Sequence, residues 1–390
     1  MDFLMDDGIL IIKLMERVDS NNAAAFESEL TDILENNAHD SIILGAENLN
    51  YISSAGLRVI LRLQKKEQSM RIVDVTAEAY DIFEMTGFTE VLPIEKAYRK
   101  MSVDGCEIIG KGAKGTVYRL NGDTIIKVYN DPDSLADIHK ERELARKAFI
   151  LGVPTAISYD VVKVGESYGS VFELLDAKSF SQLIVEDEAG FENYVNEYAK
   201  LLRLIHNTLV KSEDMPDAKD VVGKWLKTVS VYLDEEQTSQ LEKLMATIPD
   251  TLNMIHGDYH TNNLMMQNGE TLLIDMDTLA HGHPIFDLIN VYFTYVGQEN
   301  AEPQGVTAFT GIAPDTAKKL WDLFIKDYLE TEDEERINCV TNKIKLMALV
   351  RFLNHYGKRK YFEDTNGQKI LEACKGELSK LLMQLDTLDF

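Results

Sequence analysis

The first hundred residues alternate short apolar runs of strand length with longer segments of helical periodicity. The apolar runs cover residues 9–14, 41–44 and 72–75. In the segments between them apolar residues recur every three or four positions, which is typical of amphipathic helices. These helices are predicted at 23–36, 57–68 and 77–86. Strands that alternate with helices predict an α/β layer with a short sheet, and we expect residues 1–104 to form a small independent domain.

After residue 105 the pattern starts with strand-length runs and ends in a long helical region. The runs lie around a glycine-rich stretch at 110–115, at 125–129 and at 170–175. Helical periodicity covers 137–151, 193–208 and most of the chain from 313 onward. Pro314 stands where the last of these regions begins, and proline is favoured in the first turn of a helix. The change of pattern predicts a second domain over residues 105–390.

A predicted hairpin gathers polar residues within this second domain. Its parts are the strand 264–266, the turn Asn268-Gly269 and the strand 271–274. Asn-Gly is the strongest short signal for a two-residue hairpin turn. The hairpin brings Asn263 beside Asp275, and Asp258 then faces the same space. A carboxylate free to accept a proton, beside an amide and a second carboxylate, suits phosphoryl transfer assisted by Mg²⁺.

One motif resembles the signature of the kinase-like phosphotransferases. It consists of His256-Gly257-Asp258, an asparagine five residues past the aspartate (Asn263), and an apolar strand that ends in Asp275. This family includes the aminoglycoside phosphotransferases and choline kinases. The resemblance is clear over residues 105–290. It implies a bilobal α+β protein-kinase-like fold, with a β-rich lobe at 105–177 and a helical lobe at 178–390. It further implies that Asp258 is the catalytic base and that Asn263 and Asp275 are metal ligands, with Asp277 the less favoured choice for the second.

The glycine-rich stretch has the spacing of a nucleotide-covering hairpin. Its glycines are Gly110, Gly112 and Gly115. The pattern is weak by itself, but here Lys127 follows in the next strand-length run, in the order of a kinase phosphate lysine. Glycines let backbone N–H groups close over phosphates. We expect Lys127 to contact the α- and β-phosphates of ATP. Glu143 is the preferred acid to hold this lysine, with Glu141 a near alternative.

The same resemblance gives roles to residues outside these motifs. It places a hinge in the run 170–175, where backbone groups near Glu173 and Leu175 would pair with adenine. His256 would hold the catalytic loop, and Asp287 would brace the same loop from inside the protein. Apart from the resemblance, the helical pattern of 193–208 favours His206 as a packed histidine at the end of a helix over His206 as a ligand.

Residues 8–100 resemble the STAS domain of anti-anti-sigma factors. The match is carried by the stretch 49–61, which contains Ser53-Ser54-Ala55-Gly56. In that family a serine at the start of this helix is phosphorylated by a partner kinase, and the modification controls binding of an anti-sigma factor. By position that serine is Ser54. Ser53 stands where the family has an acid, and Gly45 replaces an acid at the end of the preceding strand. The alternative is that Ser53 and Ser54 only cap the helix.

The overall charge limits the partners of the chain. The formal net charge is −25, which argues against nucleic acid and anionic membranes, since both require a cationic surface. Cys106, Cys339 and Cys374 are isolated, as is usual in a reducing cytoplasm. No apolar run reaches the roughly eighteen residues of a membrane span. The acidity also favours a cationic acceptor, such as an amino alcohol or an aminoglycoside.

The choice of acceptor class depends on a short segment. Asp287 follows Asp275 by twelve positions, with no Ala-Pro-Glu between them, which leaves no room for the activation segment on which a protein kinase binds peptide. A small-molecule hydroxyl or amine is therefore the preferred acceptor. Two alternatives stay open: a regulatory protein kinase that acts on Ser54 or on a partner's STAS domain, and a non-catalytic ATP-binding pseudokinase.

Overall fold

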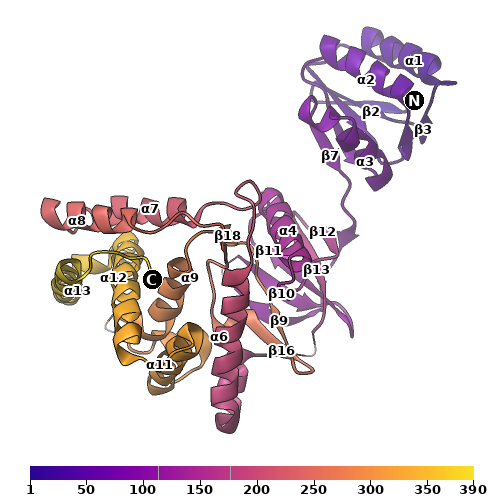
Figure 1. Ribbon diagram of the computed structural model, residues 1–390. Helices are drawn as coiled ribbons and strands as arrows, with labels where there is room; N and C mark the ends of the chain where they lie inside the picture. Colours follow the sequence, from indigo (N-terminus) through magenta and orange to yellow (C-terminus); the bar gives the residue numbers. More distant parts are fainter. Residues whose placement is uncertain (113, 176, 300) are drawn as a thin grey trace. The chain divides into compact units, whose positions relative to one another are not determined.

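A computed structural model describes residues 1–390 except Ala113, Asp176 and Asn300 (Figure 1). Ala113, a position of the glycine-rich stretch, therefore lies outside the described residues. By their contacts the residues divide into two compact units. The first contains Met1–Ser102 and Val161–Glu166, and the second contains Val103–Asp160 and Ser167–Phe390. Each unit has an apolar core of its own.

The first unit is an α/β layer built on a mostly parallel sheet. Its strand order is β1-β2-β4-β6-β7, with an antiparallel β1–β2 hairpin and parallel pairs beyond it. The strands are β1 (Phe3–Asp6), β2 (Ile9–Lys13), β4 (Ser41–Gly45), β6 (Arg71–Val75) and β7 (Ile94–Lys96). A second, short parallel pair joins β3 (Arg17–Val18) to β5 (Tyr51–Ile52). β12 (Asp160–Val164) pairs in parallel with β8 (Lys100–Met101). The predicted α/β layer is confirmed.

The helices of the first unit carry their apolar residues toward this sheet. They are α1 (Ala23–Asn36), α2 (Ser54–Lys66) and α3 (Ala77–Met85). The helix α2 begins three residues before the predicted start at Leu57 because the Ser53 side chain caps it. Ser53 Oγ accepts a hydrogen bond from the Gly56 N–H at 3.4 Å. The buried side of α2 includes Leu57, Ile60 and Leu63, in the spacing that the sequence predicted.

The second unit begins with an antiparallel sheet and one long helix. The sheet order is β13-β11-β10-β9. The elements are β9 (Glu107–Lys111), β10 (Gly115–Arg119), β11 (Thr124–Tyr129), α4 (Leu135–Ile150) and β13 (Ser167–Glu173). Figure 1 shows α4 beside the strands β11 and β13. This part is the β-rich lobe that the sequence predicted.

The rest of the second unit is mainly helical. Its longer helices are α5 (Phe180–Glu186), α6 (Phe191–Asn207), α7 (Ala218–Val229), α8 (Glu235–Ala246), α9 (Ile285–Tyr292), α10 (Gly305–Thr310), α11 (Pro314–Leu329), α12 (Glu334–Lys358) and α13 (Thr365–Gln384). The helix α9 continues into a π-helical turn, Phe293–Gly297. The helix α12 packs against α7, α9 and this turn. Among the described residues no helix is both long enough and apolar enough to cross a membrane.

Short strands hold the polar motifs between these helices. β15 (Met254–Ile255) pairs with β18 (Ala280–His281), and β14 (Lys178–Ser179) joins the hairpin of β16 (Leu264–Gln267) and β17 (Glu270–Leu273). The hairpin turn has φ of 53° at Asn268 and 84° at Gly269. A type I′ turn requires positive φ at both central residues, so the predicted Asn-Gly hairpin is confirmed.

Candidate active site

The loop that carries Asp258 leaves β15 through a sharp turn at Gly257. Gly257 has a φ of +83°, and a Cβ there would lie 2.5 Å from the carbonyl oxygen of Thr278. Only glycine combines this conformation with this close approach. Thr278 Oγ1 also donates a hydrogen bond to the His256 carbonyl at 2.7 Å. The start of the loop is therefore locked to the segment that follows Asp277.

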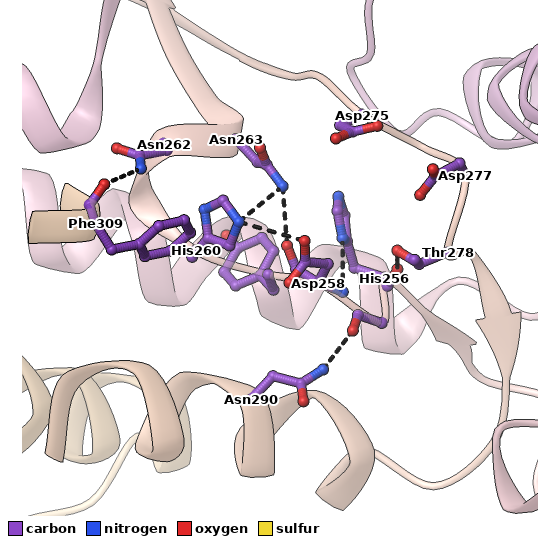
Figure 2. A network of polar contacts seen from close by, with 12 residues as sticks. His256, Asp258, His260, Asn262, Asn263, Asp275, Asp277, Thr278, Asn290 and Phe309 are labelled. Atoms are coloured by element: carbon purple, nitrogen blue, oxygen red, sulfur yellow. Dashed lines mark hydrogen bonds and ion pairs between the residues drawn. The ribbon is translucent and has the colours of Figure 1, made fainter. Parts of the chain in front are cut away.

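The buried helix α9 holds the loop from behind. The Asp287 carboxylate accepts hydrogen bonds from the backbone N–H groups of His256 and Gly257, both at 2.7 Å, and pairs with His206 Nε2 at 3.0 Å. One helical turn later, Asn290 Nδ2 donates to the Gly257 carbonyl (Figure 2). Asp287 thus braces the loop and His206 packs behind it, as the sequence predicted.

His256 is a neutral, structural member of the loop. Its ring is completely buried, and burial lowers its pKa. Nδ1 accepts a hydrogen bond from the Asp258 backbone N–H at 3.3 Å, which puts the ring proton on Nε2. The ring therefore sets the backbone direction at Asp258.

The Asp258 carboxylate is ionised and open to solvent. Its side chain is 47% exposed, and Oδ2 lies 3.4 Å from His260 Nε2. Partial burial opposes ionisation, but the hydrogen bond from His260 and nearby positive charges outweigh it and lower the pKa of Asp258. A carboxylate in this form at neutral pH can accept a proton from a hydroxyl group.

Asn263 and Asp275 lie next to this carboxylate. Asn263 Nδ2 donates to the Asp258 carbonyl at 3.0 Å. Its Oδ1 has no hydrogen-bond partner among the described residues, so this oxygen is available as a ligand. The Ile274 N–H donates to the Asn263 carbonyl at 2.9 Å, so Asp275 follows directly beside it. In Figure 2 the side chains of Asp258, Asn263 and Asp275 surround one region. Asp275 has a φ of 63°, a conformation that costs energy in a non-glycine residue and is concentrated at functional sites.

Lys127 on β11 connects this region to α4. Its Nζ lies 3.2 Å from Glu141 Oε1 and 3.2 Å from Asp275 Oδ1. Burial alone would lower the pKa of the Lys127 ammonium, but the charges of Glu141 and Asp275 raise it well above its ordinary value. The Tyr129 hydroxyl donates to Glu141 Oε2 at 2.9 Å and fixes the carboxylate that holds the lysine.

A group of three carboxylates could hold a metal ion here. Oxygens of Glu141, Asp275 and Asp277 all lie within 4.8 Å of one another. Asp277 also pairs with Lys114 of the glycine-rich stretch. Mg²⁺ takes hard oxygen ligands, few of them from protein. Asp275 and the free Oδ1 of Asn263 fit such an ion, and Asp277 offers a further oxygen.

The prediction that Glu143 holds Lys127 was wrong, and the near alternative Glu141 is the partner. Glu143 is exposed and pairs with Lys147 at 2.8 Å, one turn along the same helix. The reason is the phase of the helix. The buried stripe of α4 consists of Ile138, Leu144, Ala145 and Ala148. Glu141 lies on this stripe, three residues from Ile138 and from Leu144, whereas Glu143 points away from it.

The glycines of the nucleotide-covering stretch differ in how closely neighbouring atoms approach them. A Cβ at Gly115 would lie 2.4 Å from the Val128 carbonyl oxygen, so the close approach of β10 to β11 demands glycine there. Gly112 donates its N–H to the Gly115 carbonyl at 2.9 Å and closes the turn. Gly110 lies in β9, and a Cβ there would meet only ordinary contacts. A Cβ at Gly112 would likewise meet only an ordinary contact, so packing does not require glycine at Gly110 or Gly112.

The predicted hinge lies at the end of β13. Glu173 is the last residue of this strand, and Leu175 follows it by two positions. The Leu174 N–H donates to the Asp123 carbonyl at 2.8 Å, which ties the segment to the β10–β11 turn.

The chain matches two known families. Residues 105–318 match the phosphotransferase enzyme family, which is more than half of the chain. The chain belongs to this family. Residues 2–101 match the STAS domain. The molecule is thus a STAS domain followed by a phosphotransferase domain with a β-rich first part and a helical second part, which confirms the predicted families and fold class.

Curated relatives match the STAS domain. A putative anti-sigma factor antagonist, BtrV of Bordetella bronchiseptica, is 33% identical over 92 residues, which is 23% of this chain and 78% of the relative. An anti-sigma F factor antagonist of Paenibacillus polymyxa is 25% identical over 91 residues, 22% of this chain and 78% of the relative.

Solved structures similar to this chain include aminoglycoside phosphotransferases. The GDP and kanamycin complex of APH(2″)-IIia has 13% identity and a TM-score of 0.48, covering 77% of this chain and 98% of that one. A thermostable mutant of APH(4)-Ia in its apo form has 11% identity and a TM-score of 0.47, covering 72% and 94%.

The phosphotransferase domain holds two polar residues near the site that the sequence analysis did not identify. Asn290 lies three residues after Asp287 on α9, a spacing that places both on one helix face and could have been recognised. Arg351 lies on α12, where its charge contributes to the lowered pKa of Asp258. No pattern in the sequence joins Arg351 to the loop, because only the packing of α12 on α9 brings them together.

Ser53 and Ser54 of the STAS domain have different positions relative to α2. The Ser53 side chain caps α2, whereas Ser54 is the first residue of the helix and is exposed. The hydroxyl group of Ser54 is therefore not needed as the helix cap.

Proposed function

We propose that this chain is an ATP- and Mg²⁺-dependent phosphotransferase that acts on a hydroxyl or amine group of a small molecule. The observation that carries the proposal is the ionised, half-exposed carboxylate of Asp258 on a loop fixed by Asp287 and Asn290. Beside it lie the free amide oxygen of Asn263 and the carboxylate of Asp275. Membership in the phosphotransferase family supports the same reaction class.

In this proposal Asp258 takes the proton of the acceptor as the acceptor oxygen or nitrogen bonds to the γ-phosphorus. The bond from that phosphorus to the bridging oxygen breaks, and its electron pair leaves with ADP. Lys127 binds the α- and β-phosphates, and Asn263 and Asp275 hold the metal. When bound, Mg²⁺ neutralises charge on the phosphate oxygens. The segment near Glu173 and Leu175 binds adenine, and Gly110 and Gly112 close over the phosphates.

The short connection after Asp275 supports a small acceptor. β18 and then α9 follow at once, and α9 starts at Ile285. Thr278 of this connection and Asp287 of α9 hydrogen-bond to the backbone of the loop that carries Asp258. Such a short connection supports a small acceptor, because a protein kinase needs an activation segment at this place to bind peptide.

The exposed hydroxyl of Ser54 favours a second candidate function. The chain could act as a regulatory kinase on Ser54 or on a partner's STAS domain. A phosphate at a helix N-terminus is stabilised by free N–H groups and the helix dipole. The relatives of this domain are named anti-sigma factor antagonists, which supports a protein partner of anti-sigma type.

One incubation separates these functions. The full chain is mixed with ATP and Mg²⁺ without an acceptor, and both ADP and the intact mass of the protein are measured. Slow ADP formation without a change in mass supports the small-molecule phosphotransferase. A mass gain of one phosphate, lost in Ser54→Ala, supports the regulatory kinase. Nucleotide binding without any turnover, also after small molecules are added, contradicts both and leaves the pseudokinase.

A further inference from the structure

The guanidinium group of Arg351 has no polar partner among the described residues. It is partly buried on α12, between the Phe293 ring at 5.0 Å and the Trp225 ring at 5.9 Å from its Cζ atom. A guanidinium carries five N–H donors, and burying a charge without a hydrogen-bonded counterion is costly. The aromatic faces stabilise the cation but satisfy none of its donors. Those donors are available to a ligand.

Arg351 lies within electrostatic reach of the catalytic base. Burial lowers the pKa of Arg351 to about 10, against the opposing charges of Asp258 and Asp287. Arg351 is thus a cation at neutral pH. Neither acid is its direct partner, because Asp287 is occupied by two backbone N–H groups and His206. The Asp258 carboxylate pairs with His260.

The neighbours of Arg351 on α12 do not neutralise it. One turn later the His355 ring meets Phe293 at 5.6 Å between centroids. Burial and the charges of Arg359 and Arg351 lower the pKa of His355 to about 4, so this ring is neutral. Arg359 in turn contacts His355. His355 and Arg359 therefore supply no negative charge to neutralise Arg351.

Two buried amide oxygens, one on α9 and one on α12, also lack hydrogen-bond partners among the described residues. Asn354, three residues after Arg351, has a buried Oδ1 without a hydrogen-bond partner in the described structure, and so does Asn290. Asn290 uses its Nδ2 to hold the Gly257 carbonyl. Buried polar atoms are nearly always paired. Both atoms are amide oxygens that accept hydrogen bonds, so they can bind the hydroxyl or amine group of an acceptor but not its oxyanion.

We propose that Arg351 binds a carboxylate or phosphate group of the acceptor, so that the acceptor is a small anion that carries a hydroxyl or amine group. This inference rests on the proposed phosphotransferase function and names its substrate class. Arginine suits the role because its planar fork binds such oxyanions with two parallel hydrogen bonds. The proposal departs from the expectation of a cationic acceptor, because the net charge of the chain acts on the approach of a ligand whereas the local charge of the site decides binding.

The γ-phosphate of ATP is a second possible source of the same oxyanion chemistry. We commit to the acceptor for two reasons. The nucleotide side of the site already has Lys127 and Lys114, both from the β-rich part. Arg351 and its two aromatic neighbours all come from the helical part. The two sources are distinguished kinetically below.

The first test uses the unmodified full chain. A small-molecule extract of the cells that naturally make this chain is separated at neutral pH into fractions bound by an anion exchanger, bound by a cation exchanger, or bound by neither. Each fraction is incubated with the chain, Mg²⁺ and γ-labelled ATP. Transfer of label in the anionic fraction supports the proposal. An acceptor with a carboxylate and a protonated amine is a zwitterion, so the labelled product of every active fraction is identified by mass spectrometry. A labelled acceptor that carries no carboxylate or phosphate group of its own overturns the proposal, and transfer in no fraction overturns the proposed function instead.

The second test changes the arginine. Arg351→Gln is expected to raise the KM for the active anionic acceptor by roughly 10- to 100-fold, the usual effect of losing a hydrogen bond to a charged group. The KM for ATP should stay within about twofold, because the nucleotide ligands are intact. Arg351→Lys keeps the positive charge but not the planar guanidinium group. Its KM for the acceptor is expected to lie between those of the unmodified chain and Arg351→Gln. This variant also keeps the test valid if Arg351→Gln folds poorly.

The control is Lys345→Gln, which removes one positive charge from the same helix. Lys345 pairs with Glu377 at 2.6 Å and is expected to leave both KM values unchanged. If Arg351→Gln lowers kcat while the KM for the acceptor is unchanged, the arginine serves the transferred phosphate and the proposal fails. If Lys345→Gln raises the acceptor KM as much as Arg351→Gln does, the effect is one of general charge, and the proposal fails as well.

Discussion

The loop that carries Asp258 and the cluster around Lys127 meet at Asp275, but opposite kinds of interaction hold them. The loop is fixed by buried hydrogen bonds from Asp287, Asn290 and Thr278 to its backbone. The cluster consists of two lysines and three carboxylates. Charges of this kind can exchange partners when phosphates and a metal arrive, whereas a buried backbone network cannot. We infer that the base is positioned in advance and that the nucleotide side rearranges on binding.

The largest expected effect comes from the base itself. Asp258→Asn should lower turnover by roughly 10²- to 10⁴-fold, the usual contribution of a positioned general base. Nucleotide affinity should stay near that of the unmodified chain, because Asp258 holds neither phosphate nor metal in this account. Steady-state turnover and ATP binding on the same preparation check this. Unchanged turnover would remove the proposed mechanism.

The loop can be loosened without touching the base. Asp287→Asn removes a buried charge that accepts two backbone hydrogen bonds and one from His206. We expect the free energy of unfolding to fall by about 3 kcal/mol, as for a broken buried charged network, and turnover to fall with it. Thermal melting measures the first effect. An unaltered melting temperature would mean that the loop is held in some other way.

The Lys127 cluster offers a matched pair on one helix. Glu141→Gln should lower kcat/KM for ATP roughly tenfold, about 1.4 kcal/mol, because Lys127 loses the acid that directs it. Glu143→Gln makes the same chemical change on the exposed side of α4 and should have no effect. Initial rates over a range of ATP concentrations compare the two. Equal losses in both variants would contradict the assignment of Glu141.

These two regions also differ in how far the sequence predicted them. Asp258, Asn263 and Asp275 could be brought together because one Asn-Gly hairpin fixes their spacing along the chain. The partner of Lys127 depended on the phase of a helix. The buried residues Ile138 and Leu144 select Glu141, and both stand in the sequence as apolar positions of the same helix face.

Two further features differ in whether a local pattern predicts them. The start of α2 moved to Ser54 because a single side chain, that of Ser53, satisfies the free N–H groups. Arg351 could not be predicted because its neighbours Trp225 and Phe293 come from distant helices. Local hydrogen bonding and spacing can be read from a sequence, whereas contacts between separate helices depend on packing.

The smallest expected effect concerns the two serines of the STAS domain. Ser53→Ala removes the cap of α2 and should cost about 1 kcal/mol of stability, whereas Ser54→Ala should cost almost nothing. Ser54→Glu, a partial imitation of a phosphate, should then change ATP turnover or partner binding without a loss of stability if Ser54 is a regulatory site. Melting curves and turnover of all three variants check this. Identical behaviour of Ser54→Glu and Ser54→Ala in turnover and partner binding would refute the switch.

The most direct test of the account is the Mg²⁺ dependence of ATP binding in the unmodified chain and in Asp275→Ala. We expect Mg²⁺ to strengthen ATP binding in the unmodified chain at least tenfold, because the ion joins protein carboxylate to phosphate oxygens. In Asp275→Ala this gain should disappear, while binding without Mg²⁺ changes little. Calorimetric titrations with and without Mg²⁺ measure both. An undiminished Mg²⁺ effect in Asp275→Ala would contradict the account.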